Sequence, residues 1–327
     1  MSPPCLLITL GDVAGIGPEI VARAWPQLVR NARPVVVGDP GWVERGIKVV
    51  GSGARVKVVS APSEARPDAE LIPCIRATSA PLDRVHPGQV SAEAGRAAYD
   101  FLCHAIDRTM AGAADGIVTC PLHKEGLRAA GVKHPGHTEI LAERTGTKEF
   151  AMVLWGDGIA VAHVTLHIAL RDVFAGLTTP AVLEKIRLLN DLLPKLLGRR
   201  PRIGVAALNP HASDGGLFGD EETRIIGPAV AAAVAEGIDA SGPWPADTLF
   251  VRAHKGEFDG IAAMYHDEGH IAMKLRSGPR CVNITVGLPI VRTSVAHGTA
   301  YDIVGKGVAD AGSLVAAADV AGRLASR

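Results

Sequence analysis

Short apolar runs alternate with longer stretches of helical spacing along this 327-residue chain, and this alternation constrains the fold most strongly. The runs are CLLITL (5–10), PVVVG (34–38), GIVTC (116–120), GIAVAHVTL (158–166), RIGVAALN (202–209), GIAAMYH (260–266) and CVNITVG (281–287). Strands separated by helices pair in parallel, because a parallel connection needs a long crossover segment. We therefore predict an α/β fold with parallel sheets.

The stretches between these runs have the start signals of helices. Their apolar residues recur every three to four positions at 19–29, 91–110, 181–197 and 221–237. Pro18 suits a first helical turn, and Ser91, with Glu93 close behind it, suits an N-cap.

Length and composition favour two lobes. A chain of 327 residues exceeds the size that one hydrophobic core supports well. Hydrophobic residues make up 47% and aromatic residues only 4%, which is typical of aliphatic parallel sheets covered by helices. We predict a first α/β lobe from residues 1–140 plus 283–327 and a second from residues 141–282.

Charge and cysteine usage exclude several classes of partner. The formal net charge is zero and no basic run occurs, which argues against nucleic acid and favours a small-molecule ligand. The N-terminal apolar run lacks a basic flank and is too short for a membrane span, so we expect no membrane association. Scattered cysteines without CxxC spacing indicate reduced packing residues and a cytoplasmic protein: Cys5, Cys74, Cys103, Cys120 and Cys281.

Three predicted strands each run into a histidine-bearing turn: HVTLHIALRD (163–172), LNPHASDGGLFGDEE (208–222) and MYHDEGHIAMK (264–274). The carboxyl ends of parallel strands share one edge, so His167, His211 and His266 can converge there. Three imidazoles with open positions suit a borderline divalent cation. The alternative for any one of them is a hydrogen-bonded structural histidine. His163 is an alternative ligand, although we interpret it as a sheet-packing residue.

A phosphate and a nucleotide are indicated elsewhere in the chain. Lys274, Asn283 and Arg292 fall within or just after the last predicted strands and suit a phosphate, the alternative being solvated surface charge. The glycine-rich HGTAYDIVGKG (297–307) suits a ribose or adenine. The turn GDVAGIGPEI (11–20) is weaker, because it matches neither GxGxxG nor GxxxxGK[ST] and a plain strand-to-helix turn explains it.

Taken in order, several motifs resemble the 4-hydroxythreonine-4-phosphate dehydrogenase family of vitamin B6 (pyridoxine) biosynthesis. They are GDVAGIGPEI, GHTE (136–139), LNPHA, GPWPADTLF (242–250), AMYHDEG, VNITVGLP, RTS and HGTA, and they span nearly the whole chain. HGTAYDIVG also resembles the nucleotide-binding loop of the isocitrate and isopropylmalate dehydrogenase group. The resemblance implies two α/β/α lobes with a cleft between them.

The resemblance also implies roles for particular residues. His167, His211 and His266 would bind a divalent metal (zinc, magnesium, cobalt or manganese), with one histidine supplied across the interface of a homodimer that shares its active sites. The substrate would be contacted by His137, Thr138, Lys274, Asn283 and Arg292. The cofactor, NAD or NADP, would contact the HGTA loop at Gly298, Thr299 and Asp302.

The implied reaction is the oxidation and decarboxylation of 4-(phosphooxy)-threonine to 3-amino-2-oxopropyl phosphate. The chain departs from the family pattern at Val13, Ser213, Asp214, Glu268 and Ala296, where Pro, Gly, Glu, Gln and Asp are usual. Relatives similar in the GHIAMK stretch act on 4-phospho-D-threonate or 4-phospho-D-erythronate, which would give dihydroxyacetone phosphate. These departures leave the amino and hydroxy substrates as alternatives.

We expect the metal to chelate the substrate's hydroxyl and carboxylate. Asp247 and Asp267 are the candidate catalytic carboxylates, the alternative being helix-cap or turn residues. Two other classes remain open: a metallohydrolase or metal-dependent aldolase, which the HGTAYDIVG loop disfavours, and a non-catalytic phosphate-ester binder, which the three histidines disfavour.

Overall fold

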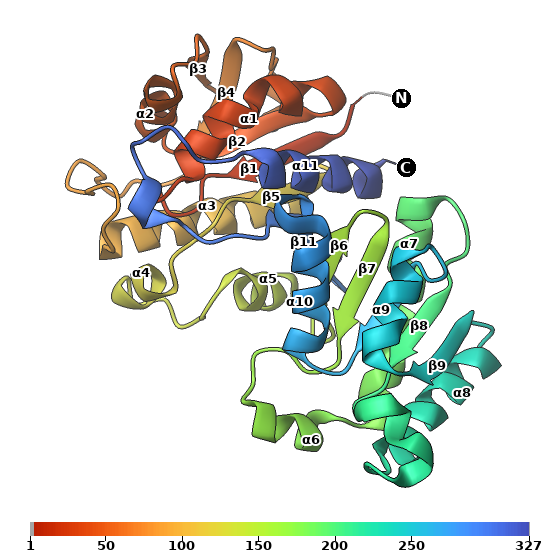
Figure 1. Ribbon diagram of the computed structural model, residues 1–327. Helices are drawn as coiled ribbons and strands as arrows, with labels where there is room; N and C mark the ends of the chain where they lie inside the picture. Colours follow the sequence, from red (N-terminus) through yellow and green to blue (C-terminus); the bar gives the residue numbers. More distant parts are fainter. Residues whose placement is uncertain (1–2, 327) are drawn as a thin grey trace. The chain divides into compact units, whose positions relative to one another are not determined.

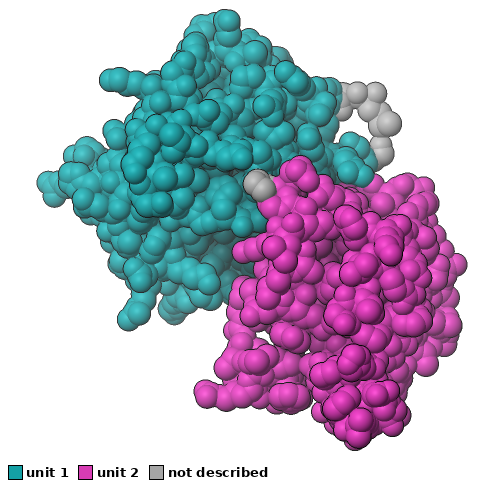
Figure 2. Space-filling view, in the orientation of Figure 1, with its two compact units in different colours: residues 1–150, 288–327 teal, residues 151–287 magenta. Residues whose placement is uncertain are grey.

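The computed structural model describes residues 3–326 and divides into two compact units (Figure 2). Unit 1 comprises Met1–Phe150 with Leu288–Arg327, and unit 2 comprises Ala151–Gly287. The predicted boundary at 140/141 would fall inside a helix, His137–Thr145, and that at 282/283 inside a strand, Val282–Val286.

Unit 1 is a parallel sheet covered by helices (Figure 1). Its strands, in the spatial order β3-β4-β2-β1-β5-β12, are β3 (Arg55–Val58), β4 (Leu71–Arg76), β2 (Arg33–Gly38), β1 (Cys5–Thr9), β5 (Gly116–Thr119) and β12 (Val291–Val295). Its helices are α1 (Gly17–Asn31), α2 (Pro40–Val50), α3 (Ala92–Met110), α4 (Lys124–Ala129), α5 (His137–Thr145) and α11 (Gly312–Ala325). Helices α1, α2 and α11 pack together, and α4 and α5 pack on α3.

Unit 2 is a mixed sheet. Its strands, in the order β11-β6-β7-β10-β8-β9, are β11 (Val282–Val286), β6 (Ala151–Gly156), β7 (Ile159–His163), β10 (Gly260–Ala263), β8 (Ile203–Ala206) and β9 (Ala240–Trp244). Helices α7 (Thr179–Leu197) and α8 (Gly227–Ala235) pack together, α9 (Ala246–His254) packs on β8, α10 (His266–Ser277) packs on β6 and β7, and α6 (Val173–Gly176) is a single turn.

The predicted α/β fold is confirmed, with one correction to its strand directions. Strand β6 pairs antiparallel with both β7 and β11, whereas β7, β10, β8 and β9 are parallel. The cause is the tight Asp157–Gly158 turn between β6 and β7, at which both residues have positive φ. A connection of this length makes a hairpin and excludes a parallel crossover.

Both predicted helix starts are confirmed. Pro18 lies in the first turn of α1, where its missing N–H costs no hydrogen bond. Ser91 caps α3, because its hydroxyl accepts a hydrogen bond from the amide of Ala94 at 3.1 Å. Within residues 3–326, no helix is long and apolar enough to cross a membrane.

A buried carboxylate joins the loop before β8 to the start of β10. The side chain of Asp259 is only 7% exposed, and it accepts hydrogen bonds from Arg199 Nη2 at 2.7 Å and from the Arg202 backbone amide at 2.8 Å. Burial alone would raise the pKa of Asp259, but the hydrogen bonds from the two arginines outweigh it and hold the pKa well below its usual value.

Asp259→Asn should therefore lower the free energy of unfolding by about 2 kcal/mol near neutral pH, because it removes a charge that accepts several hydrogen bonds. A depressed folded-state pKa stabilises the fold fully above the unfolded value, about 4, and this contribution is lost as the pH falls through the folded pKa. Urea denaturation from pH 7 to pH 3 should show the two proteins converging in acid. The exposed Asp191→Asn is the matched control, and a constant difference down to pH 3 would contradict the assignment.

Candidate active site

Strand β10 lies between β7 and β8 in unit 2, and all three run parallel. Their carboxyl ends therefore share one edge, where the three predicted histidines follow. His167 comes four residues after β7, His266 begins α10 directly after β10, and His211 lies in a turn after β8. The rings of His167 and His266 lie 5.8 Å apart, and both line a cavity of about 360 Å³.

Asp267 orients the ring of His266. Its Oδ1 lies 2.6 Å from His266 Nδ1, and a carboxylate can only accept. The ring therefore carries its proton on Nδ1 and leaves the Nε2 lone pair for a ligand, as in many metal-binding histidines. In the structure, Asp267 therefore contacts His266, which is one of the predicted metal-binding residues.

His211 lies on a backbone segment of unusual conformation. Four consecutive non-glycine residues from His211 to Asp214 have φ between 46° and 69°. Such left-handed residues are strained unless the surrounding structure holds them. The His211 side chain is exposed, with its ring 6.5 Å from that of Phe218.

Glu222 holds this segment in place. Its buried carboxylate accepts hydrogen bonds from the backbone amides of Leu208 and Asn209 at 2.9 and 2.8 Å, and from the hydroxyl of Ser213. Burial would raise the pKa of Glu222, but hydrogen bonds from the Asn209 side chain, the Ser213 hydroxyl and the Asn209 amide outweigh it and lower the pKa. Ser213, a departure from the family pattern, therefore serves the loop that carries His211.

The single chain brings together two of the three predicted metal ligands. No group of three or more His, Cys, Asp or Glu side chains within residues 3–326 is arranged to hold a metal ion. His167 and His266 nevertheless fit a borderline divalent cation by their chemistry: two neighbouring imidazoles line one cavity, and Asp267 orients one of them. Such a cation would need at least one further ligand.

The sequence did not indicate the contacts that Glu268, His163 and His270 make near this edge of the sheet. Burial raises the pKa of Glu268 to about 8, although the amides of Met264 and Tyr265 donate to its carboxyl. His163 lies in β7 and is buried, as expected of a packing residue, but it also lies within hydrogen-bond distance of His270. Burial and neighbouring imidazoles lower the pKa of His163 to about 3 and that of His270 to about 4.

Unit 1 contains a buried cation at the predicted substrate residues. Arg292 in β12 is 2% exposed, and its Nη2 donates to the hydroxyl of Thr119 at the end of β5 at 2.7 Å. Burial lowers the pKa of Arg292 to about 9, with Glu139 acting in the opposite direction, so the guanidinium remains charged at neutral pH. Burial and this charge lower the pKa of His137 well below its usual value, against the opposing effect of the Cys120 backbone. Thr138 follows in the first turn of α5.

Two buried carboxylates hold the predicted cofactor loop. Tyr301 donates its hydroxyl to Asp12 Oδ2 at 2.7 Å, and the Gly305 amide donates to Glu19 Oε1 at 2.6 Å. Burial raises the pKa of Asp12, against hydrogen bonds from Tyr301 and the Ala14 amide. Sequence spacing does not reveal such partners, because Asp12 and Tyr301 are 289 positions apart.

The predicted cofactor residues differ in their surroundings. Thr299 is 9% exposed, and its carbonyl accepts from the Ile16 amide at 3.0 Å. A Cβ at Gly15 would lie 2.9 Å from Thr299, so glycine permits this approach. Gly298 and Asp302 are exposed. The turn after β1 therefore supports the loop, in agreement with its interpretation as a plain strand-to-helix turn.

The remaining predicted residues lie in unit 2. Lys274 lies on α10 and is exposed, and Asp247 lies in the first turn of α9, where its Oδ1 accepts from the adjacent Thr248 amide at 2.9 Å. Asn283 lies in β11 and points its Nδ2 at the sulfur of Met152, 2.9 Å away. The Asn283 Oδ1 is buried and has no hydrogen-bond partner within residues 3–326, as expected of a group that meets a ligand.

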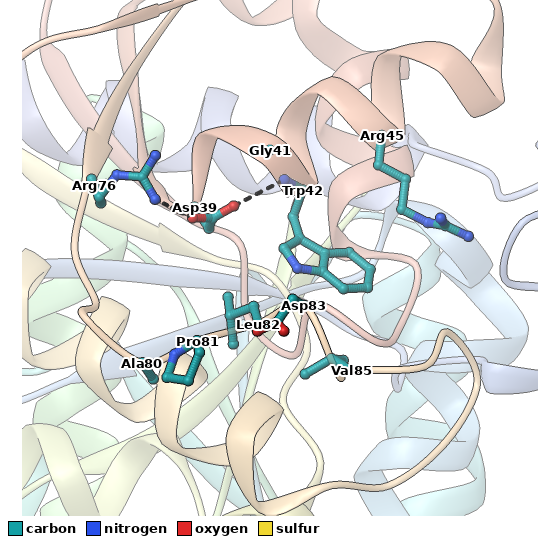
Figure 3. A pocket seen from close by; sticks show the side chains of 10 residues that line it. All are labelled: Asp39, Gly41, Trp42, Arg45, Arg76, Ala80, Pro81, Leu82, Asp83 and Val85. Atoms are coloured by element: carbon teal, nitrogen blue, oxygen red, sulfur yellow. Dashed lines mark hydrogen bonds and ion pairs between the residues drawn. The ribbon is translucent and has the colours of Figure 1, made fainter.

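A separate cavity of about 530 Å³ lies in unit 1 at the carboxyl ends of β2 and β4 (Figure 3). Its charged groups contact one another: Arg76 pairs with Asp39 at 2.6 Å, and Arg45 lies over the Trp42 ring at 5.6 Å. Asp39 also caps α2 by accepting from the Trp42 amide at 3.1 Å. The role of Asp39 in capping α2 explains why these charged side chains lie together, so they do not indicate a ligand.

Comparisons with known proteins agree with these features. The family model described as "Pyridoxal phosphate biosynthetic protein PdxA" matches residues 30–321. The 4-hydroxythreonine-4-phosphate dehydrogenase of Beijerinckia indica is 48% identical over 98% of this chain and 94% of its own length. The D-threonate 4-phosphate dehydrogenase of Bordetella bronchiseptica is 45% identical over 98% of this chain and 93% of its own. A crystal structure of 4-hydroxythreonine-4-phosphate dehydrogenase from Klebsiella pneumoniae is similar with a TM-score of 0.91, 40% identity and 99% coverage of both chains.

Proposed function

The chain belongs to the PdxA family of dehydrogenases, and from this premise we propose that it oxidises and decarboxylates a phosphorylated four-carbon hydroxy acid with NAD or NADP. The observation that carries the proposal is the parallel packing of β7, β10 and β8, which brings histidine-bearing turns to one edge. Membership makes the chain an enzyme, so the non-catalytic binder and the metallohydrolase or aldolase are set aside.

The substrate we propose is 4-(phosphooxy)-threonine, with 4-phospho-D-threonate or 4-phospho-D-erythronate as the alternative. Relatives with both kinds of name are similarly identical to this chain, at 48% and 45%. In each case carbon C3 gives its hydride to the nicotinamide and the C3 hydroxyl gives its proton to a base, and the resulting β-keto acid loses carbon dioxide. The product is 3-amino-2-oxopropyl phosphate from the amino acid and dihydroxyacetone phosphate from the hydroxy acids.

We assign phosphate recognition to the cationic and polar groups predicted from sequence. Arg292 contributes a buried, charged guanidinium group. Such a group can bind a phosphate through two parallel, charge-assisted hydrogen bonds. His137 and Thr138 at the start of α5 contribute further donors, and the first amides of that helix favour an anion. Lys274 and Asn283 are assigned to the same substrate.

We assign metal binding to His167, His211 and His266. When bound, a divalent cation supplies a positive charge that acidifies the substrate hydroxyl and stabilises the negative charge left by loss of carbon dioxide. Asp267 orients His266 in this scheme. Asp247 remains the candidate for taking the hydroxyl proton, because it is exposed at the first turn of α9.

We assign the dinucleotide to the loop that contains Gly298, Thr299 and Asp302. The nicotinamide supplies the hydride acceptor. The chain's own contribution is the fixed loop, since Thr299 packs against the turn after β1 and Tyr301 is tied to Asp12. Comparing the reaction rates with NAD and with NADP shows which dinucleotide is preferred.

We also propose a cytoplasmic location. All five cysteines are buried and none forms a disulfide within residues 3–326, which suits a reducing compartment.

We propose a homodimer in which the third metal ligand comes from the second copy. Large apolar side chains near His167 are exposed, including Leu170 at 67% and Phe174 at 59%, and Leu217 near His211 is 72% exposed. Apolar groups that gather beside a polar site commonly mark a protein interface. Since His167 and His266 already adjoin within one chain, His211 is the ligand that we assign to the partner.

Mixing inactive His167→Ala and His211→Ala proteins should then restore activity after subunit exchange. Half of the dimers would be mixed and one of their two sites would be intact, so recovery should approach about one quarter of the native rate. Mixing His167→Ala with His266→Ala is the control and should recover nothing, because these two residues serve the same site from the same chain. Recovery only in the control mixture would reverse the assignment.

The reaction itself is tested by a substrate panel. Purified protein should reduce NAD or NADP with one of the three phosphorylated acids, and the products should be carbon dioxide and the corresponding phosphorylated ketone. Treatment with a chelator should abolish turnover, and zinc, cobalt, magnesium or manganese should restore it. Nicotinamide reduction without carbon dioxide release, or full activity in metal-free protein, would contradict the proposal.

Arg292→Ala should lower kcat/KM for the phosphorylated acid by tens-fold, because a charge-assisted contact to phosphate contributes about 2 kcal/mol. The slow reaction of the unphosphorylated acid should hardly change, and the affinity for the dinucleotide should stay constant. Arg30→Ala, an exposed arginine in the last turn of α1, controls for arginine removal. Weakened dinucleotide binding with intact phosphate discrimination would assign Arg292 to the cofactor.

A further inference from the structure

Two buried imidazoles lie behind His266. His163 is the last residue of β7 and is 4% exposed, and His270 lies on α10 and is 9% exposed. His270 Nδ1 lies 3.2 Å from His163 Nε2. Apolar side chains of similar size would fill this space without needing hydrogen bonds, so packing alone does not account for the pair.

The hydrogen bonds define the tautomers of both rings. His270 Nδ1 also lies 3.2 Å from the backbone carbonyl of His266, and a carbonyl can only accept. His270 therefore carries its proton on Nδ1 and shares it between this carbonyl and His163 Nε2. The proton of His163 must then reside on Nδ1, which is buried and has no hydrogen-bond partner in the part of the chain that the structure describes.

The pair bears directly on the ring of His266. The rings of His270 and His266 are stacked, with centroids 3.7 Å apart and an interplanar angle of 11°. Asp267 holds the same His266 ring in its plane through Nδ1. His266 is thus fixed along one edge and across one face, which leaves its Nε2 with a defined direction.

Helix α10 has a glycine, Gly269, where it packs against the His163 ring. A Cβ on residue 269 would lie 2.4 Å from His163 Nε2, so only glycine allows α10 to approach β7 this closely. Gly269 directly precedes His270 on α10, and a larger residue there would have to displace either the His163 ring or the helix.

We propose that His163 and His270 form a positioning pair that fixes the orientation of His266 and thereby sets the affinity of the chain for a divalent cation. This inference rests on the metal site of the proposed function. Residues that orient a metal-binding histidine typically change metal affinity by about 10–100-fold when they are replaced. The pair acts through His266, so it is assigned no contact with the substrate.

Metal titration of the purified full-length protein tests the pair without using activity. Calorimetry with Co²⁺ on chelator-stripped protein should show at least about tenfold weaker binding for His163→Leu and for His270→Leu. The double variant should be no weaker than the weaker single variant, because the two residues act as one unit. The visible spectrum of bound Co²⁺ should also change, since it reports the ligand geometry.

Conservative variants separate positioning from simple loss of packing. His163→Gln keeps an acceptor for the His270 N–H and should bind Co²⁺ nearly as native, whereas His163→Leu should not. His270→Phe keeps a flat ring against His266 without the N–H and should fall between native and His270→Leu. His254→Leu, an exposed histidine on α9, is the matched control and should leave binding unchanged.

The outcomes distinguish this inference from the proposed function. Native affinity and an unchanged Co²⁺ spectrum in both leucine variants would overturn the pair while leaving the metal site intact. Failure of the native protein to bind Co²⁺, Zn²⁺, Mg²⁺ or Mn²⁺ would overturn the metal site, and the pair with it. Thermal melts of the metal-free proteins show whether each variant is folded, and His163→Gln and His270→Phe decide the matter if a leucine variant is not.

Discussion

The parallel register of three strands is the constraint on which the chemistry of unit 2 depends. Gly260 of β10 aligns with Ala160 of β7 on one side and with Ile203 of β8 on the other. Because all three strands point the same way, the turns that follow them begin at the same edge. A single antiparallel strand among them would send one histidine turn to the opposite edge. The hairpin that reverses the chain lies between β6 and β7, before the first of these strands, so it does not disturb them.

The sequence predicts seven of the twelve strands in the described part of the chain. All seven apolar runs contain strands, because residues buried on both faces of a sheet produce continuous apolar segments. Five strands lie outside these runs. Strand β6 (AMVLWG) is a continuous buried apolar segment and carries the same signal, and β4 (LIPCIR) is largely buried but interrupted by Pro73. The other three lack the signal. Strand β3 (RVKV) lies at the edge of its sheet and is mostly exposed, and β9 (ASGPW) is an edge strand that contains Pro243. Strand β12 (VRTSV) is buried yet polar, because Arg292 donates to Thr119 of the neighbouring strand and Thr293 donates to the Ala317 carbonyl of α11.

Some features of the candidate site can also be predicted from the sequence, and others cannot. Residue types and their place after strands predict that His167 and His266 lie near each other, because both follow strands that end at the shared edge. Partnerships between distant residues cannot be read this way. Glu222 holds the His211 segment across nine or more positions, and His163 meets His270 across 107. Sequence spacing carries no information on which of many buried polar residues will meet, since that depends on the packing of α10 on β7.

Dense packing of imidazoles is physically tolerable only when they are neutral. His163 and His270 lie 4.7 Å apart between ring centroids, and His270 lies 3.7 Å from His266, so protons on several rings would repel one another strongly. Burial removes this problem by lowering the pKa of His163 to about 3 and that of His270 to about 4. At neutral pH His163 and His270 are therefore uncharged, and they contribute lone pairs and N–H donors without adding positive charge. A divalent cation beside His266 would then meet no electrostatic opposition from the rings behind it, and their contribution would be to hold His266 in place.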